Sequence, residues 1–218
     1  MKISCVIPAY NESQNIIKVV AKVSPLVDEV IIVDDCSSDN TYELAKTTTA
    51  IVLRHPINRG QGAALQTGDE YALNHDADIV VHFDADDQFK AEEIKDLIKP
   101  IIENKADAVF GSRFLGSANF PYIKRVVIMP LARLINRFFG ITLSDPQSGF
   151  RALNRQTLSQ IKIENRGMAH CSEILYKTFK SGARIVEVPI TVTYHEFGQS
   201  FGGGFKIIKD LIIHNFIK

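Results

Sequence analysis

Two aspartates in the segment Asp84-Ala85-Asp86 directly follow an apolar run, Ile79 to Phe83. Alternate side chains of an extended segment point the same way, so Asp84 and Asp86 can serve one cation, directly or through water. Carboxylate oxygens suit hard divalent ions such as Mg²⁺ or Mn²⁺. Such an ion would neutralise a diphosphate leaving group, so the triplet predicts a metal-diphosphate centre.

Two further polar loops follow apolar runs earlier in the chain, at Pro8 to Glu12 and at Asp34 to Asp39. Each loop alone has a structural explanation, because Asn11 can make a turn and Asp39 can cap a helix. Carboxylates gathered at one edge of a sheet repel one another, however, unless a cation or ligand donors compensate them. The three loops together therefore predict a ligand site.

A glycine pair, Gly60 and Gly62, precedes a segment of helical spacing. Leu65 stands where the third glycine of a dinucleotide-binding loop belongs, and the pair follows the third apolar run rather than the first. The sequence also contains no GxxxxGK[ST] element. A dinucleotide oxidoreductase and a P-loop ATPase are therefore disfavoured. We expect a tight loop that opens a helix and lies near a nucleotide ribose.

Apolar runs that alternate with helical spacing must position these loops. We expect strands at 3–8, 30–33, 50–54, 79–83 and 108–110, and helices at about 13–24, 40–48, 61–75 and 91–103. This order predicts an α/β fold with a mainly parallel sheet and helices on both faces. Ligands of such sheets bind beyond the carboxyl ends of the strands, where the polar loops lie.

The composition bounds the class of protein. A chain of 218 residues fits one domain, and its 3 widely spaced cysteines predict reduced thiols in a cytoplasmic protein. Formal net charge is +0, and we expect no nucleic-acid partner. The halves differ in sign, because residues 1–107 hold 10 Lys and Arg against 19 Asp and Glu, while residues 108–218 hold 15 against 6. The acid-free stretch 108–144 could face an anion.

Six motifs in register resemble glycosyltransferase family 2, in particular its polyprenyl-phosphate, dolichol-phosphate mannose synthase-like branch. They are VIPAYNE, VDDCSSDNT, NRGQGAALQTG, FDADDQ, GSRF and DPQSGFRAL, and the resemblance covers about residues 1 to 200. It implies a single domain of GT-A fold over 1–218. Within it we expect a nucleotide-sugar-binding half at 1–112, an acceptor-side half at 113–204 and an apolar, basic C-terminal helix at 205–218.

The resemblance also implies roles for individual residues. Those that would hold the base, ribose and diphosphate of UDP or GDP are Pro8, Ala9, Tyr10, Asn11, Glu12, Asp35, Asp39, Gly62, Asp84, Ala85 and Asp86, with Asp39 equally explained as a helix cap. The metal ligands would be Asp84 and Asp86. Those placed near the diphosphate or an acceptor phosphate would be Gln88, Arg113, Arg125, Ser148 and His195.

The implied reaction is an attack on sugar C1 from the face opposite the nucleoside diphosphate, with inversion, while the metal and arginines take the developing charge. A polyprenyl phosphate acceptor is already a nucleophile at neutral pH. A saccharide hydroxyl would instead need a carboxylate base, for which Asp145 and Glu173 are the candidates. A third alternative is a protein that binds nucleotide sugars without catalysis.

Two features bear on the acceptor. The segment 195–201 replaces the basic phosphate-gripping motif of the polyprenyl branch with His195 and Phe201 at its cationic positions. The segments 123–139 and 205–217 combine apolar residues with Lys or Arg, and each can lie on an anionic bilayer or cover the sheet as a core helix. We expect a protein peripheral to the inner face of a membrane, or one bound to a separate membrane subunit.

Overall fold

The computed structural model describes residues 1–116, 143–167 and 169–193. They form a seven-stranded sheet in the order β3-β2-β1-β4-β6-β5-β7. The strands are β1 (Ile3–Ala9), β2 (Glu29–Asp34), β3 (Ile51–Arg54), β4 (Ile79–His82), β5 (Ala108–Ser112), β6 (Arg151–Asn154) and β7 (Ile185–Pro189). Among them β6 alone runs antiparallel to its neighbours β4 and β5. The expectation of a mainly parallel sheet is therefore confirmed.

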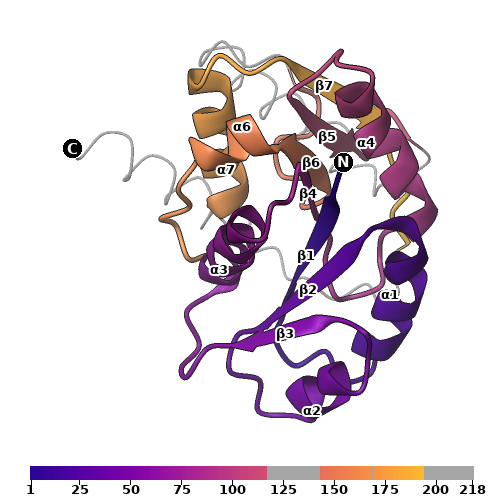
Figure 1. Ribbon diagram of the computed structural model, residues 1–218, viewed down its shortest axis with the longest axis vertical. Helices are drawn as coiled ribbons and strands as arrows, with labels where there is room; N and C mark the ends of the chain where they lie inside the picture. The colour runs from indigo at the N-terminus through magenta and orange to yellow at the C-terminus, as the bar shows by residue number, and fades with distance from the viewer. Residues whose placement is uncertain (117–142, 168, 194–218) are drawn as a thin grey trace, which may run out of the picture.

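Helices cover both faces of the sheet, as the alternating pattern predicts (Figure 1). One face carries α1 (Ile16–Val23), α2 (Thr41–Lys46) and α4 (Ile94–Ile102), and the other carries α3 (Gln61–Asn74), α6 (Arg155–Ser159) and α7 (His170–Lys180). A short 3-10 turn at Ser24–Leu26 lies where the first expected helix was to end. Another at Ala91–Glu93 lies where the fourth expected helix was to begin. In the first of these turns Pro25 lies just inside the start, where its missing N–H is tolerated.

The apolar core is divided by the sheet into two layers, because successive side chains of a strand point to opposite faces. In β1, Cys5 and Ile7 pack with α1 and α4, whereas Val6 packs with α3. Close packing of α3 requires Gly68, since a Cβ there would lie 2.3 Å from a Val6 methyl group. In the described part of the chain no helix is long and apolar enough to cross a membrane.

Candidate active site

Carboxylates from the loops after β1, β2 and β4 come close enough to influence one another. The pKa of Glu12 is raised, first by burial and then by the charges of Asp86 and Asp39, although a hydrogen bond from Asn15 opposes the shift. The parallel topology thus brings all three loops to one edge of the sheet. Negative charge accumulates at this edge, as the spacing of the loops predicts.

The first two loops are held together by hydrogen bonds across the edge. Asn11 adopts the left-handed conformation, with φ of 57°. Its backbone N–H donates to Ser37 Oγ at 2.9 Å, and its Oδ1 accepts from the Ser38 N–H at 2.9 Å. The Glu12 N–H donates to Thr41 Oγ1 at 2.7 Å. The turn at Asn11 therefore has a structural role and holds Glu12 in place.

Asp39 accepts four hydrogen bonds in this region. Oδ1 takes the N–H and hydroxyl of Thr41, the first residue of α2, and Oδ2 takes the Ser13 N–H at 3.2 Å. With the Ser13 side chain included, these bonds outweigh desolvation and lower the pKa of Asp39 to about 2. Of its two predicted roles, the contacts of Asp39 support that of a helix cap.

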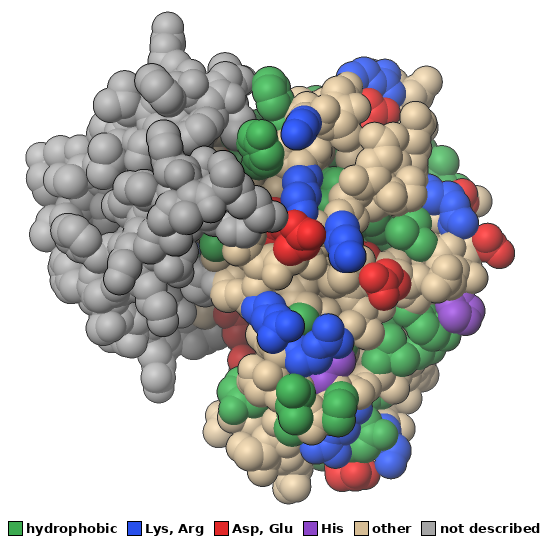
Figure 2. Space-filling model, turned by 90° about the vertical axis from the view of Figure 1, so that its left-hand side faces the viewer, with side chains coloured by type: hydrophobic (Ala, Val, Ile, Leu, Met, Phe, Trp, Pro, Cys, Tyr) green, Lys and Arg blue, Asp and Glu red, His purple; other side chains and the backbone are tan. Residues whose placement is uncertain are grey.

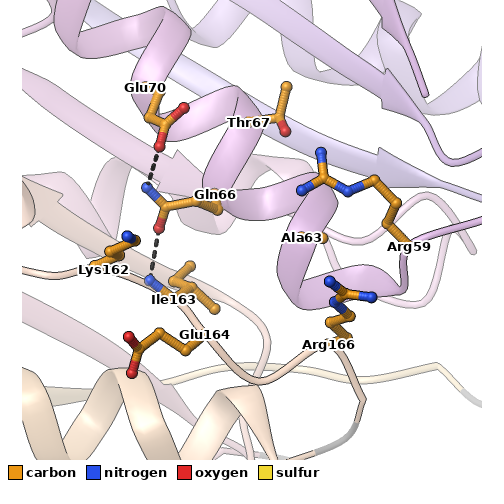
Figure 3. Close-up of a pocket in the computed structure, with 9 residues that line it drawn as sticks. All are labelled: Arg59, Ala63, Gln66, Thr67, Glu70, Lys162, Ile163, Glu164 and Arg166. Carbon is orange, nitrogen blue, oxygen red and sulfur yellow. Dashed lines mark hydrogen bonds between the residues drawn. The ribbon is translucent and has the colours of Figure 1, made fainter. Parts of the chain in front are cut away.

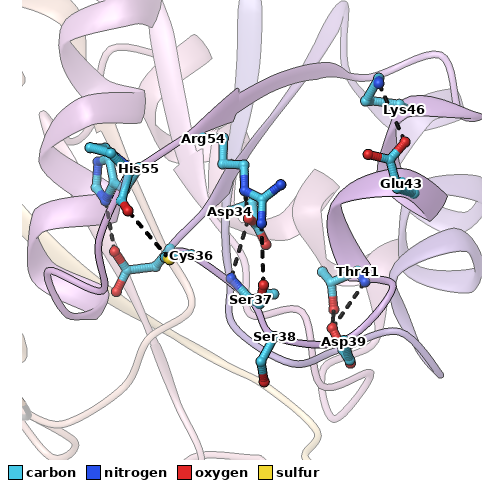
Figure 4. A network of polar contacts seen from close by, with 12 residues as sticks. Asp34, Cys36, Ser37, Ser38, Asp39, Thr41, Glu43, Lys46, Arg54 and His55 are labelled. Carbon is cyan, nitrogen blue, oxygen red and sulfur yellow. Dashed lines mark hydrogen bonds and ion pairs between the residues drawn. The ribbon is translucent and has the colours of Figure 1, made fainter.

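Asp35 is almost fully buried and accepts three hydrogen bonds. They come from His55 Nδ1 at 2.7 Å, the Arg59 N–H at 2.8 Å and the Gly60 N–H at 2.6 Å. A carboxylate accepts about four such bonds, so the described residues leave Asp35 one further acceptor position. Figure 4 shows His55 in this network, together with Asp34, which pairs with Arg54 at 3.1 Å.

The remaining residues of the first loop differ in exposure. Pro8 and Ala9 are buried in β1, and the Ala9 carbonyl accepts from the Asp35 N–H at 2.8 Å. The Tyr10 side chain is 50% exposed and can contact a nucleoside. Gly62, by contrast, packs against the chain itself, since a Cβ there would lie 1.9 Å from the Asn165 carbonyl oxygen. Its N–H donates to the Arg166 carbonyl at 3.3 Å, so the glycine pair makes room for segment 165–166.

The ionised form of Asp84 is disfavoured, although the charges of Arg151 and Arg113 oppose this effect. Its Oδ1 accepts from Gln61 Nε2 at 3.0 Å, and Gly149 packs so close that a Cβ would lie 2.6 Å from Oδ2. Burial and the neighbouring Asp86 raise the pKa of Asp84 to about 6. A cation would relieve this unfavourable charge, so the residues fit a divalent metal ion.

The ligand set at this site is incomplete from the protein alone. No three His, Cys, Asp or Glu side chains converge to hold a metal within residues 1–116, 143–167 and 169–193. Asp84 and Asp86 would thus supply oxygen ligands, and a diphosphate and water the remainder, as is usual for Mg²⁺ and suits Mn²⁺. Ala85 is buried between the two aspartates.

The rest of this loop anchors the two aspartates. Asp87, with φ of 58°, pairs with Lys18 and Lys22 of α1. The Gln88 N–H donates to Asp86 Oδ1 at 3.1 Å, and its carbonyl accepts from the Thr193 N–H at 2.9 Å. Gln88 therefore positions Asp86 through its backbone.

Arg113 and Asp145 form a bidentate ion pair, and the charge of Arg113 also acts on Asp84. Nε and Nη2 of Arg113 lie 2.6 and 2.7 Å from Oδ2 and Oδ1 of Asp145, and the Arg113 N–H also donates to Oδ2. Glu187 of β7 holds the loop by accepting from the N–H groups of Ser144 and Asp145. Asp145 was a candidate general base, but its carboxylate is buried and engaged with a cation.

Glu173, the other candidate base, holds a loop. Its carboxylate accepts from the N–H groups of Glu164 and Asn165 and pairs with Lys177 at 2.7 Å. These bonds outweigh desolvation and lower the pKa of Glu173. Its contacts are those of a structural hydrogen-bond acceptor.

Sequence reasoning missed a buried polar chain behind the metal site. Asp69 accepts from His82 Nε2 at 2.7 Å, and His82 Nδ1 accepts from Arg151 Nε at 2.9 Å. Desolvation lowers the pKa of His82, which fits a neutral ring between the two ions. Arg151, the arginine of the DPQSGFRAL motif, was visible in the sequence, but its hydrogen-bond partner His82 lies 69 positions away. Gln61, which donates to Asp84, was missed for the same reason.

Other predicted residues are accounted for as follows. Ser148 is buried, and its hydroxyl donates to the Phe150 carbonyl at 3.4 Å. Arg125, His195 and the segments 123–139, 195–201 and 205–218 lie outside the described residues.

A separate hollow of about 340 Å³ lies between α3 and the loop 162–166 (Figure 3). It opens on the face that carries α3, α6 and α7, where Lys and Arg side chains recur (Figure 2). Arg59, Lys162 and Arg166 line it together with Glu70 and Glu164. No predicted site residue lines this hollow, but Arg59, whose N–H donates to Asp35, does.

The comparisons with known proteins agree with this arrangement. A model described as glycosyl transferase family 2 matches residues 4–162. A UDP-N-acetylglucosamine–dolichyl-phosphate N-acetylglucosaminyltransferase of Methanococcus voltae is 34% identical and covers 95% of this chain and 94% of its own. An undecaprenyl-phosphate mannosyltransferase of Micrococcus luteus is 30% identical over 98% of this chain and 92% of its own.

Among solved structures, glucosyl-3-phosphoglycerate synthase from Mycobacterium tuberculosis, in complex with Mn²⁺, UDP and glucosyl-3-phosphoglycerate, matches with a TM-score of 0.76. The identity is 25%, and the match covers 97% of this chain and 78% of that one. The expected GT-A fold is confirmed by this likeness. The carboxylate edge and the fold are consistent with a family model that spans most of the chain. The chain is therefore a glycosyltransferase that belongs to family 2.

Proposed function

We propose that this glycosyltransferase moves a sugar from a UDP- or GDP-sugar to a polyprenyl phosphate, with inversion at C1. An oxygen of the acceptor phosphate forms the new bond to C1, and the bond from C1 to the β-phosphate oxygen of the donor breaks. The nucleoside diphosphate leaves with both electrons of that bond. The acceptor is already ionised, so the step releases no proton that a base must take.

One observation carries this choice of acceptor. Both carboxylates that the sequence offers as base candidates are engaged, Asp145 by Arg113 and Glu173 by Lys177 and two backbone N–H groups. A phosphate oxygen needs no base. Because it is negatively charged, it also binds to a basic surface more favourably than a neutral hydroxyl does. The names of the Methanococcus and Micrococcus relatives, which specify dolichyl phosphate and undecaprenyl phosphate, support the same class of acceptor.

The described residues would divide the work as follows. Tyr10 and the remaining acceptor position on Asp35 would bind the nucleoside. Asp84 and Asp86 would hold Mg²⁺ or Mn²⁺, which would supply charge neutralisation for the diphosphate. Arg113, fixed by Asp145 and with 25% of its side chain exposed, would face a phosphate group. The Mn²⁺ or Mg²⁺ and UDP named in the solved relatives support this division.

A polyprenyl phosphate is held by a bilayer, so the proposal includes contact with the cytoplasmic face of a membrane. The basic, apolar segments 123–139 and 205–218 would provide that contact, or would bind a membrane subunit. Arg125 and His195 would join Arg113 around the acceptor phosphate.

The test is a transfer assay with the full chain. Protein, Mn²⁺ or Mg²⁺ and a radiolabelled donor, either UDP-N-acetylglucosamine, UDP-glucose or GDP-mannose, are incubated with undecaprenyl or dolichyl phosphate in detergent. We expect a chloroform-soluble glycolipid that is lost with EDTA. Transfer to a saccharide with none to either lipid would instead establish the alternative acceptor. Nucleotide binding without any transfer would favour a non-catalytic binding protein.

A further inference from the structure

Gln147 lies at the tip of a turn that joins the two charged corners of the site. Two residues before it, Asp145 holds Arg113. Two residues after it, Gly149 packs against the carboxylate of Asp84. The Ser148 N–H approaches the Asp145 carbonyl at 3.5 Å, and Pro146 occupies the first central position, where its fixed φ favours a turn. The position of Gln147 is therefore set by the backbone.

The side-chain amide of Gln147 has one end paired and the other end unpaired. Nε2 donates to Ser172 Oγ of α7. Oε1 is buried and has no hydrogen-bond partner among the residues that the structure describes. Reversing the amide would exchange these roles, because Oε1 would then accept from the serine hydroxyl and the NH₂ group would be unpaired. Either orientation leaves one buried polar end unpaired, and such groups in native proteins are uncommon.

A second unpaired group begins the adjoining strand. Arg151 is 0% exposed, and its Nη1 and Nη2 have no oxygen or nitrogen hydrogen-bond partner within the described ranges, although the guanidinium neighbours the Cys171 thiol and its Nε is bound to His82. Its charge lowers the pKa of Asp84, so the guanidinium lies near the metal carboxylate. The chain thus has unpaired polar groups on both Gln147 and Arg151 beside the predicted diphosphate site, which is the pattern of a site completed by a polar ligand.

We propose that Gln147 is a specificity-determining residue that hydrogen-bonds a hydroxyl group of the transferred sugar. This inference rests on the proposed function, because the sugar is bonded to the diphosphate that a metal ion at Asp84 and Asp86 would hold. The sugar would consequently lie close to Asp84. Gly149, two residues after Gln147, packs against this carboxylate. A hydroxyl both donates and accepts, so it pairs with the unpaired end of the amide in either orientation.

The first experiment separates sugar recognition from nucleotide recognition. Binding of UDP, GDP, UDP-glucose, UDP-N-acetylglucosamine and GDP-mannose is measured by calorimetry with Mn²⁺ present. The proteins are the wild type, Gln147→Met, which keeps the side-chain volume, and Gln156→Ala, an exposed glutamine of α6 as control. We expect Gln147→Met to weaken the preferred sugar nucleotide about tenfold and to leave its free nucleoside diphosphate unchanged. Gln156→Ala should change neither affinity.

The second experiment identifies the group that Gln147 recognises. Deoxy analogues of the preferred donor, each lacking one hydroxyl, are compared in the wild type and in Gln147→Met. For the wild type, one analogue should bind about tenfold more weakly than the parent donor. For Gln147→Met, that analogue and the parent donor should bind with equal affinity. Ser172→Ala, which releases the amide, should reduce that discrimination without affecting the nucleoside diphosphate.

Several outcomes would overturn the inference. If Gln147→Met weakens sugar nucleotide and nucleoside diphosphate equally, the residue only supports the loop. If it weakens neither, Gln147 makes no contact with the sugar. Failure of the wild-type protein to bind any of the five nucleotides would instead contradict the proposed function, so the two failures are distinguishable.

Discussion

The loop after β4 and the loop before β6 each contribute an aspartate to the candidate active site, but the two carboxylates have different contacts. Asp84 accepts from the Gln61 amide and from no Lys or Arg side chain in the described part of the chain, and its pKa is raised to about 6. Asp145 is held in a bidentate pair by Arg113. The first carboxylate suits a cation that arrives with the substrate, whereas the second already has its cation.

This difference separates two functions that sequence spacing does not distinguish. A carboxylate left with excess negative charge can bind metal, and a carboxylate satisfied by the protein positions its partner. In the proposed function Arg113 would therefore be the group that meets the acceptor phosphate, and Asp145 the residue that orients it. Four substitutions or conditions would break or sharpen this comparison.

The largest effect is expected for Asp84→Asn. The amide oxygen can still accept from Gln61, so the fold should be retained, but a metal carboxylate is lost and turnover should fall at least about 100-fold. Initial rates of sugar transfer with Mn²⁺ and the melting temperature would be measured. The matched control is Asp76→Asn, since that side chain is 94% exposed and should tolerate the change. A rate near that of the wild type would remove Asp84 from the metal site.

Asp145→Asn should act mainly on stability. It leaves the Arg113 guanidinium without its charged partner in a partly buried place, so the free energy of unfolding should fall by about 2 kcal/mol. Urea denaturation would measure the change. The control is Glu103→Gln, which breaks a surface pair with Lys105 and should have no measurable effect. Equal effects of the two substitutions would mean that the buried pair is no stronger than a surface pair.

The pH dependence of metal binding should report the raised pKa of Asp84. Below pH 6 this carboxyl is mostly protonated in the metal-free protein, and a cation must displace the proton; above pH 6 it is already ionised. The affinity for Mn²⁺ alone should therefore rise up to tenfold per pH unit toward pH 6 and then level off. Water-proton relaxation titrations from pH 5 to 8 would test this, and a flat profile would contradict it.

The smallest effect is expected for Glu173→Gln. The substitution weakens the pair with Lys177 and the hold on segment 164–165, so stability should fall by about 1 kcal/mol. Sugar transfer should stay within about threefold of the wild type. Loss of turnover with donor binding retained would make Glu173 a general base and would favour the saccharide acceptor.

The sequence predicted what depends on local pattern. Each of the five expected strands is present within two residues of its predicted ends, because buried parallel strands are short apolar runs. Strands β6 and β7 were not predicted from periodicity. The segment Arg151–Asn154 contains a buried arginine and only two apolar residues, so its pattern is not that of a core strand.

What could not be predicted is how far-separated residues pair. The position of Asp145 at the site was expected, but its engagement by Arg113 depends on a contact across 32 positions. Likewise Gly60 and Gly62 were placed correctly at a helix start, but only the three-dimensional packing of segment 165–166 explains why side chains are excluded there. Cys36 adopts the left-handed conformation, with φ of 62°. Neither its residue type nor its neighbours in the sequence predict this conformation.

The double pairing of Asp87 with Lys18 and Lys22 has a consequence for binding. It ties the loop that carries Asp84 and Asp86 to α1, so the conformational entropy of this loop is lost during folding. A cation and a diphosphate bound there would meet carboxylates that are already ordered, and their association would not bear that entropic cost. Two lysines of a helix would thus strengthen binding without being ligands themselves.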